Sequence, residues 1–125
     1  MSFCSVSLAR CLKAAEPVRT DSGNPSNAAT PSAPPGLDLA AVLHALAEKG
    51  ITRLLVEGGS RVASSFVAAG LVDEAWLLRG PGAIGAGGVA ALDALPLSAI
   101  TQSPQFKVHA SETLQNDTLT IYERT

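Results

Sequence analysis

The sequence of 125 residues predicts an α/β domain, in which helices flank a mainly parallel sheet that ends in a C-terminal antiparallel hairpin. Between residues 38 and 79, apolar residues recur first with the helical period and then with that of a strand, in the order helix, strand, helix, strand. Near the end, the segments 106–114 and 118–124 alternate between apolar and polar residues around a polar turn at 115–117, which is typical of a hairpin.

Composition limits the chain to one domain and excludes several classes of protein. Hydrophobic residues make up 46% of the chain and charged residues 16%, which supplies enough apolar material for a core. A net charge of −2 and 4% aromatic residues do not fit a nucleic-acid-binding surface, so nucleic acid is not an expected partner. No apolar run reaches the roughly 18 residues of a membrane span, and the N-terminus does not resemble a signal peptide. We therefore expect no membrane partner and a cytoplasmic location.

The two cysteines, Cys4 and Cys11, are separated by six residues and have no Cys or His cluster nearby. This spacing indicates neither a zinc site nor a disulfide framework. Free thiols in a reducing cytoplasm are expected, and no metal site is predicted.

The N-terminal part divides into a head and a linker. Residues 1–19 form a short head, in which SFCSVS fits a strand and the following LARCLKAAEP fits a helix that Pro17 ends. Residues 20–36 combine Pro, Ser, Asn and Gly without periodicity, and we expect a poorly ordered linker or loop there. The main body is then residues 37–125.

The body begins with an amphipathic helix, which Asp38 is suited to cap and Gly50 to end. The apolar positions of this helix are Leu39, Val42, Leu43 and Leu46. The apolar segment 51–56 follows, and its length and composition predict a strand buried on both faces in the middle of a sheet.

A second helix is predicted at 61–69, with Gly70 at its end, and residues 73–79 fit the next strand. Because a helix returns the chain between the two strands, we expect 73–79 to be parallel and adjacent to 51–56. Trp76, the only tryptophan, is predicted to lie in the core.

The candidate site lies in the segment LLVEGGS at residues 54–60. Gly58 and Gly59 allow backbone angles that other residues resist, and they leave the main chain open to a ligand. Ser60 can cap the helix that follows, whose first N–H groups and positive dipole end suit a pyrophosphate. Glu57 follows the strand at the edge where α/β sheets place ligand contacts. The same residues also fit a plain tight turn with Glu57 on a solvated rim, and the motif alone does not decide between the two.

Other patterns are weaker. Gly80, Gly82 and Gly85 satisfy GxGxxG, but Gly87 and Gly88 follow at once and no long helix begins there, so a flexible loop, or one that borders a ligand, is expected.

Titratable and nucleophilic residues elsewhere form no catalytic pattern. His44 and His109 lie at no metal-ligand spacing, so each is expected to be structural or exposed. Asp73 and Glu74 are neighbours in a strand and point to opposite faces. Ser64 and Ser65 lack the GxSxG context of a nucleophile, which disfavours a hydrolase.

Taken jointly, the segment GLDLAAVLHALAEKGITRLLVEGGSRVASSFVAAGLVDEAWLLRGPGAIG resembles the C-terminal half of the reductase domain of the bifunctional riboflavin-biosynthesis deaminase/reductase family. The helix, the VEGG turn, the SFVAAGLVDE segment and the glycine loop at 80–88 match in order and in spacing. The resemblance covers about residues 36–125.

This resemblance implies a partial dihydrofolate-reductase-like fold and NADPH-dependent reduction of 5-amino-6-(5-phosphoribosylamino)uracil. In that family the glutamate of VEGG contacts the phosphoribosyl substrate, which assigns substrate binding to Glu57. In that family, the segment from the second glycine into the helix surrounds the cofactor phosphates. The first glycine, Gly58, is added to the expected site because it leaves the main chain open to a ligand. The expected NADPH-binding residues are Gly58, Gly59, Ser60, Arg61, Val62, Ala63, Ser64 and Ser65.

The chain also departs from the family. The HxE and PCxxC zinc signature of the deaminase is missing, which excludes deaminase activity. The first half of the reductase domain has no counterpart here, so we expect a fragment or truncated gene product. A non-catalytic nucleotide-binding or self-associating remnant stays open beside the enzyme. Because an incomplete sheet leaves unpaired strand edges, a homodimer is expected.

Overall fold

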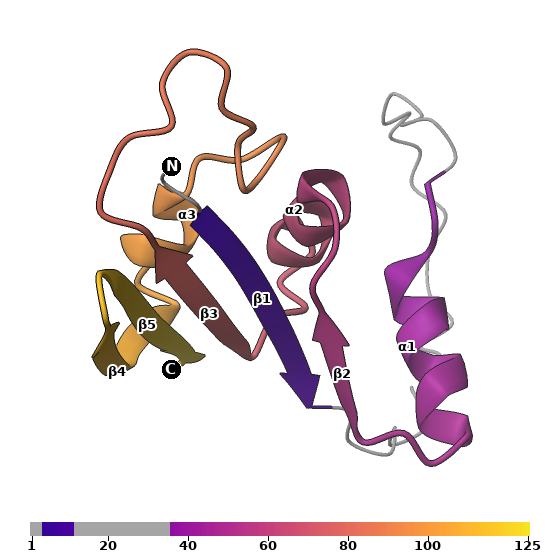
Figure 1. Ribbon diagram of the computed structural model, residues 1–125. Coiled ribbons are helices and arrows are strands. Elements are labelled where there is room, and N and C mark those ends of the chain that lie inside the picture. Colours follow the sequence, from indigo (N-terminus) through magenta and orange to yellow (C-terminus); the bar gives the residue numbers. More distant parts are fainter. Residues whose placement is uncertain (1–3, 12–35) are drawn as a thin grey trace. The chain divides into compact units, whose positions relative to one another are not determined.

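The computed structural model describes residues 4–11 and 36–125 of the chain (Figure 1). It divides into two compact units, one of Met1–Cys11 with Arg53–Thr125 and one of Leu12–Thr52. The first unit contains a sheet with two helices, and the second contains one described helix.

The sheet has five strands in the order β2-β1-β3-β5-β4, and every neighbouring pair is antiparallel (Figure 1). Its strands are β1 (Cys4–Cys11), β2 (Arg53–Val56), β3 (Glu74–Arg79), β4 (Phe106–Leu114) and β5 (Asp117–Arg124). The fold is therefore mixed α/β, but the predicted mainly parallel sheet is wrong.

The error concerns which strand lies beside β3. β2 and β3 run in the same direction, since both are antiparallel to β1, and the helix between them returns the chain as expected. They are not adjacent, because β1 lies between them. β2 is also an edge strand, with Leu55 60% exposed, and not a central strand buried on both faces. A short apolar run fits a central strand and an edge strand alike, because a strand with only one covered face also needs apolar side chains to bury.

Helix α1 (Leu39–Glu48) has the predicted boundaries. The side chain of Asp38 accepts a hydrogen bond from the N–H of Ala41 at 3.1 Å, which is the expected N-cap. At the other end Gly50 has a φ of +80°, and the N–H groups of Gly50 and Ile51 donate to carbonyls of the last turn. This is a Schellman ending, which explains the glycine.

The core lies between one face of the sheet and the helices α2 (Ser60–Ala68) and α3 (Ser98–Thr101). Phe66 of α2 and Ile100 of α3 are 4% and 2% exposed. Alternate residues of β3 point to this face, as do their partners on β5. The buried apolar residues of the sheet unit are Ala63, Phe66, Val72, Ala75, Leu77, Leu92, Ile100 and Tyr122.

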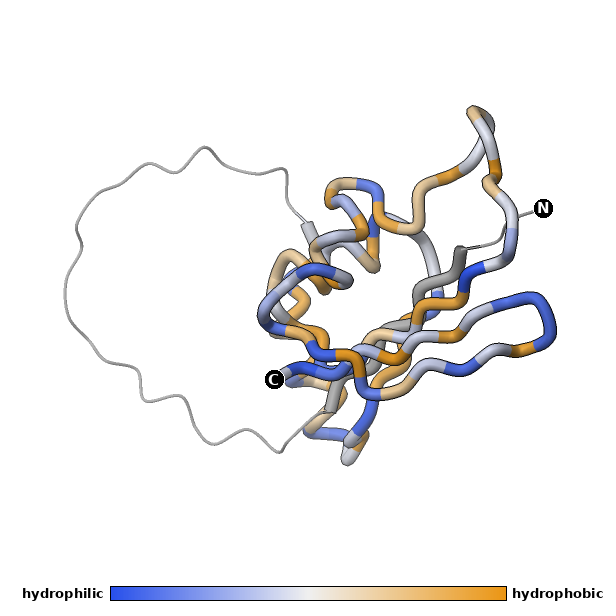
Figure 2. The backbone as a smooth tube through the Cα atoms, turned by 90° about the vertical axis from the view of Figure 1, so that its left-hand side faces the viewer, coloured by the Kyte–Doolittle hydropathy of each residue, from blue (hydrophilic) through white to orange (hydrophobic). Residues whose placement is uncertain are grey.

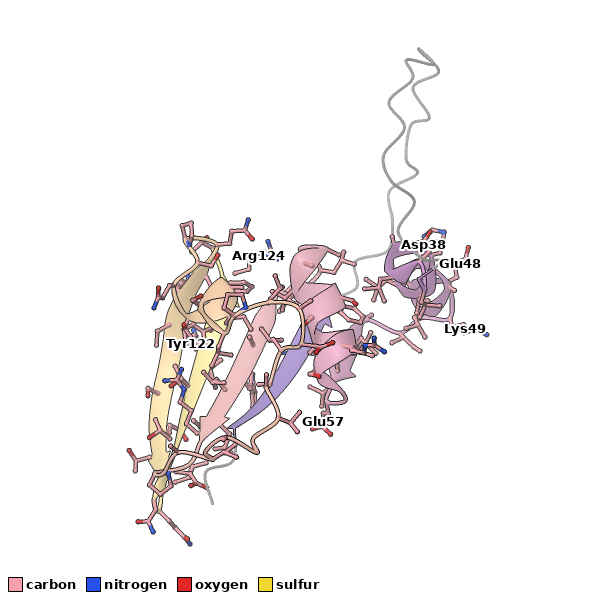
Figure 3. All side chains as sticks on the ribbon, turned by 90° about the horizontal axis from the view of Figure 1, so that it is seen from above. Asp38, Glu48, Lys49, Glu57, Tyr122 and Arg124 are labelled. Atoms are coloured by element: carbon pink, nitrogen blue, oxygen red, sulfur yellow. The ribbon has the colours of Figure 1, made fainter. Side chains whose placement is uncertain are left out.

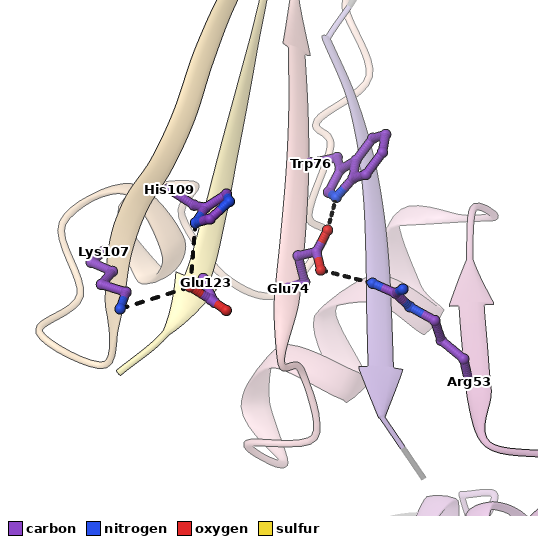
Figure 4. Close-up of polar contacts among 6 residues, drawn as sticks. All are labelled: Arg53, Glu74, Trp76, Lys107, His109 and Glu123. Carbon is purple, nitrogen blue, oxygen red and sulfur yellow. Dashed lines mark hydrogen bonds and ion pairs between the residues drawn. The ribbon is translucent and has the colours of Figure 1, made fainter.

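Trp76 lies on the opposite face of β3 and is 43% exposed, so the prediction that it is a core residue is wrong. Its Nε1 donates to Oε1 of Glu74, and Oε2 of Glu74 accepts from Arg53 at 2.9 Å (Figure 4). The period of two correctly separates Trp76 from the buried Ala75 and Leu77, but period alone does not tell which face is covered.

The predicted C-terminal hairpin is confirmed. β4 and β5 pair along their length, with an irregularity between Val108 and Ala110. The turn at Gln115 and Asn116 is hydrophilic (Figure 2), and Gln115 has a φ of +58°.

The head differs from its prediction. β1 extends to Cys11, so no helix begins at Leu8; pairing with strands on both sides overrides the local helical pattern. The rest of the predicted head helix and the linker at 20–35 lie outside the described residues. The division of the chain at residues 19 and 36 stays a prediction. In the part that the structure describes, no helix has the length and hydropathy needed to cross a bilayer.

Candidate functional site

The turn between β2 and α2 contains the two glycines of the predicted phosphate site. Gly59 has a φ of +69°, a conformation that L residues rarely adopt. A Cβ atom built on Gly58 or on Gly59 would meet no protein atom within 4 Å. The glycine at 59 is therefore required by the backbone angle and not by crowding, and the space beside both residues is open.

Helix α2 begins at the end of this turn, with Gly59 as its N-cap and no side-chain capping bond. The prediction that Ser60 caps the helix is wrong, since Ser60 is already helical. The first helical bond runs from the N–H of Ala63 to the carbonyl of Gly59 at 3.1 Å. The N–H groups of Ser60, Arg61 and Val62 thus lie outside the ladder of the helix, as in other anion-binding helix ends.

Glu57 is exposed and lies between the end of β2 and the two glycines (Figure 3). The pairing of β1 with β2 stops at Leu8 and Val56, whereas its pairing with β3 continues to Cys4 and Arg79. β1 and β3 therefore extend beyond the end of β2, on the side where Glu57 leaves the sheet. Because β2 and β3 run in the same direction, the loop that follows β3 starts at the same end of the sheet as Glu57 (Figure 1).

That loop, residues 80–97, contains the glycine cluster and no helix, as predicted. It turns at Gly85, whose φ is +82°, and the N–H of Gly88 donates to the carbonyl of Gly85 at 3.1 Å. A Cβ on Gly88 would lie 2.6 Å from Cγ2 of Ile84, so a larger residue there would collide with the turn.

The loop then returns to the start of α2. The N–H of Asp93 donates to Oγ of Ser64 at 2.9 Å and, in a longer contact, to the carbonyl of Ser60 at 3.4 Å. The N–H of Ala94 also donates to Oγ of Ser64, at 3.3 Å. The Asp93 carboxylate lies 3.5 Å from Nε of Arg61, in an exposed ion pair.

The eight predicted cofactor residues separate into two groups. Gly58, Gly59, Arg61 and Val62 are exposed, Ser60 is half-buried, and the Arg61 side chain is 90% exposed. Ala63 and Ser64 are 5% and 3% exposed and point into the protein.

Ser65 is the last of the eight. It is exposed, and its hydroxyl donates to the carbonyl of Arg61 at 2.9 Å. The structure therefore brings Glu57 together with the glycines and the exposed first turn of α2, but not with the side chains of Ala63 and Ser64.

Asp93 was missed by sequence reasoning. It contacts α2 from about 30 residues further along the chain, within an irregular segment that has no periodicity. One signal was present, because Asp93 is the only charged residue between Arg79 and Lys107.

The two histidines are exposed, and each lies near a carboxylate. His44 is exposed, 3.4 Å from Glu48, and His109 is exposed, 3.4 Å from Glu123, which also lies 3.7 Å from Lys107 (Figure 4). Within the described ranges, no three His, Cys, Asp or Glu side chains cluster closely enough to hold a metal ion.

The groups at this turn are of the kind that can bind an anion. Three N–H groups, the positive end of a nine-residue helix and the Arg61 guanidinium surround a turn whose glycines leave the main chain open. Glu57 beside this turn is an acceptor for hydroxyl groups.

Comparison with known proteins identifies the family of the chain. A family model described as the RibD C-terminal domain matches residues 10–120, from the end of β1 into β5. No curated protein matches the chain. Since the family model covers well over half of the sequence, the chain belongs to the RibD C-terminal domain family, the reductase domain of the riboflavin-biosynthesis deaminase/reductase.

Proposed function

We propose that this chain binds NADPH and reduces the ribose of 5-amino-6-(5-phosphoribosylamino)uracil. Membership in the RibD C-terminal domain family supports a reductase of riboflavin biosynthesis. The observation that carries the proposal for this chain is the open glycine turn, with Gly59 at a φ of +69°, leading into the first turn of α2.

Each part of the turn has its own role in the proposal. The N–H groups of Ser60, Arg61 and Val62 bind phosphate oxygens, and the exposed Arg61 side chain compensates their charge. The Glu57 carboxylate accepts hydrogen bonds from the sugar hydroxyls and orients the ribose. Bound NADPH supplies the hydride, so the protein contributes position and electrostatics more than acid–base chemistry.

The proposal also concerns the assembly of the chain and its location. We infer that the chain forms a homodimer, in support of which β2 is a sheet edge with Leu55 60% exposed. A cytoplasmic location, inferred from the sequence, belongs to the same proposal.

Calorimetric titration with NADPH, followed by a turnover assay with the substrate, tests the proposal. We expect Glu57→Gln to bind NADPH like the wild type but to bind the substrate about tenfold more weakly, because a charged acceptor is lost. Gly59→Val should lose NADPH binding, since its side chain fills the open turn and opposes the positive φ.

Three outcomes separate the alternatives. NADPH binding with turnover supports the reductase. NADPH binding without turnover supports a non-catalytic nucleotide-binding module. A wild type that releases no heat with NADPH, or a Gly59→Val variant with wild-type affinity, would contradict the proposed site.

A further inference from the structure

Ser64 has a position that its predicted role as a cofactor contact does not explain. It is a polar side chain that is buried, with 3% exposure, and it lies on the inner side of α2. Its hydroxyl oxygen accepts hydrogen bonds from two consecutive main-chain N–H groups, of Asp93 at 2.9 Å and of Ala94 at 3.3 Å.

These bonds fix the far end of the glycine loop. Residues 81–90 are exposed, whereas Leu92 is 4% exposed and Asp93 and Ala94 are bonded to α2. The near end of the loop is fixed at Arg79, where β3 still pairs with β1 and β5. Ser64 thus anchors the return of a loop that otherwise makes few packing contacts.

The anchored end touches the residues that start α2. The Asp93 N–H also reaches the carbonyl of Ser60 at 3.4 Å, and the Asp93 carboxylate lies 3.5 Å from the Arg61 guanidinium. Ser60 and Arg61 carry two of the N–H groups assigned to phosphate binding. Asp93 therefore contacts both the start of α2, through its N–H, and the Arg61 guanidinium, through its carboxylate.

We propose that Ser64 is a positioning residue, which holds the glycine loop and Asp93 against the first turn of α2 and thereby sets the affinity for the dinucleotide phosphates. This inference rests on the proposed function. Ser64 touches no ligand in this role, because its hydroxyl is directed to the loop and its side chain is buried. Without the Ser64 hydroxyl, the part-buried N–H of Ala94 would lose its acceptor, and the N–H of Asp93 would keep only the 3.4 Å contact with the carbonyl of Ser60.

Two alanine variants of the full chain test the inference. Ser64→Ala removes the acceptor, and Ser111→Ala is the matched control, since Ser111 is an exposed serine on β4. In Ser64→Ala we expect the amide hydrogens of Asp93 and Ala94 to exchange about tenfold faster than in the wild type. The amides of Ala75 and Leu77, in the centre of the sheet, should keep their wild-type rates and show that the fold is intact.

Calorimetry with NADPH then measures the consequence for binding. The dissociation constant of Ser64→Ala should rise about fivefold, as expected for a lost hydrogen bond. In the turnover assay, KM for NADPH should rise while kcat at saturating NADPH stays at the wild-type value. Ser111→Ala should match the wild type in exchange, affinity and kinetics. Ser64→Cys keeps an acceptor at this position, although a weaker one on a somewhat larger side chain, and should be intermediate, which covers the case that Ser64→Ala does not fold.

The outcomes distinguish this inference from the function on which it rests. A wild type that binds NADPH together with a Ser64→Ala variant of equal affinity overturns the positioning role and leaves the proposed function in place. Unchanged exchange at Asp93 and Ala94 in the folded variant overturns it as well. A wild type without NADPH binding overturns both.

Discussion

At the residue scale, two adjacent glycines have different reasons to be glycine. Gly59 has a φ of +69° and a ψ of 125°, which favours glycine strongly. Gly58 has no positive φ, and a Cβ there would meet no protein atom within 4 Å. The fold therefore requires only Gly59, and the glycine at 58 is needed only if a ligand approaches the main chain.

This difference predicts opposite results for two alanine variants. Gly59→Ala should lower the free energy of unfolding by about 1–3 kcal/mol, the cost of an L residue in a sparsely populated backbone region. Gly58→Ala should stay within about 0.5 kcal/mol of the wild type, as for an ordinary surface substitution. Urea denaturation of both variants measures the difference, and equal midpoints would show that Gly59 does not need its positive φ.

At the element scale, the connection between α2 and β3 is held from the far end of the chain. Nε of Arg124 donates to the carbonyl of Val72 at 2.7 Å, and Nη2 donates to the carbonyl of Gly70 at 2.9 Å. The main-chain N–H of Arg124 donates to the carbonyl of Asp73 at 2.8 Å, and its guanidinium lies 5.4 Å from the Phe106 ring centre. β5 thus stabilises the connection between α2 and β3, which follows the candidate site.

Arg124→Lys should therefore destabilise the fold although the charge is kept. An ammonium group cannot bond both carbonyls in the geometry of the planar guanidinium, so we expect a loss of about 2 kcal/mol in the free energy of unfolding. Arg79→Lys is the control, because Arg79 is exposed at the end of β3. Guanidinium denaturation curves of the two variants that coincide would contradict the role of Arg124.

At the scale of the whole molecule, the two faces of the sheet differ in how far the helices of the same unit cover them. One face packs on α2 and α3, where Ala75 and Leu77 are 1% and 2% exposed. On the other face Trp76 is 43% exposed, and Leu55 on the edge strand is 60% exposed. Exposed apolar side chains on a sheet that ends in a free strand favour association between copies.

If copies of the chain associate through β2, a charged side chain on this strand should prevent association, whereas the same change elsewhere on the surface should not. Wild-type protein should sediment as a dimer at high concentration, and Leu55→Asp should shift it to the monomer, because a charge at the edge opposes pairing. Val89→Asp is the matched control, since Val89 is 84% exposed in the glycine loop. If the two variants sediment equally, β2 does not take part in the interface. A monomeric wild type would contradict the dimer.

The sequence by itself determined the local features of this protein. The sequence predicted the boundaries of α1, the β4–β5 hairpin and the approximate extent of β3. Each of these signals lies within a few residues of the structure that it specifies. The signals are the carboxylate of Asp38, the glycines at Gly50 and Gly70, and the alternation along the strands. The glycine turn after Glu57 was found for the same reason.

Only the tertiary structure decided what depends on distant parts of the chain. β1 pairs with β2 and β3 from more than 40 residues away, which made the sheet antiparallel and placed β2 at its edge. Ser64 was predicted to face a ligand, but the return of Asp93 gives its hydroxyl a partner inside the protein. Alternation assigns Trp76 to a face without telling which face is covered. Local signals fix the conformation of a segment, whereas its neighbours are chosen by packing between segments far apart in sequence.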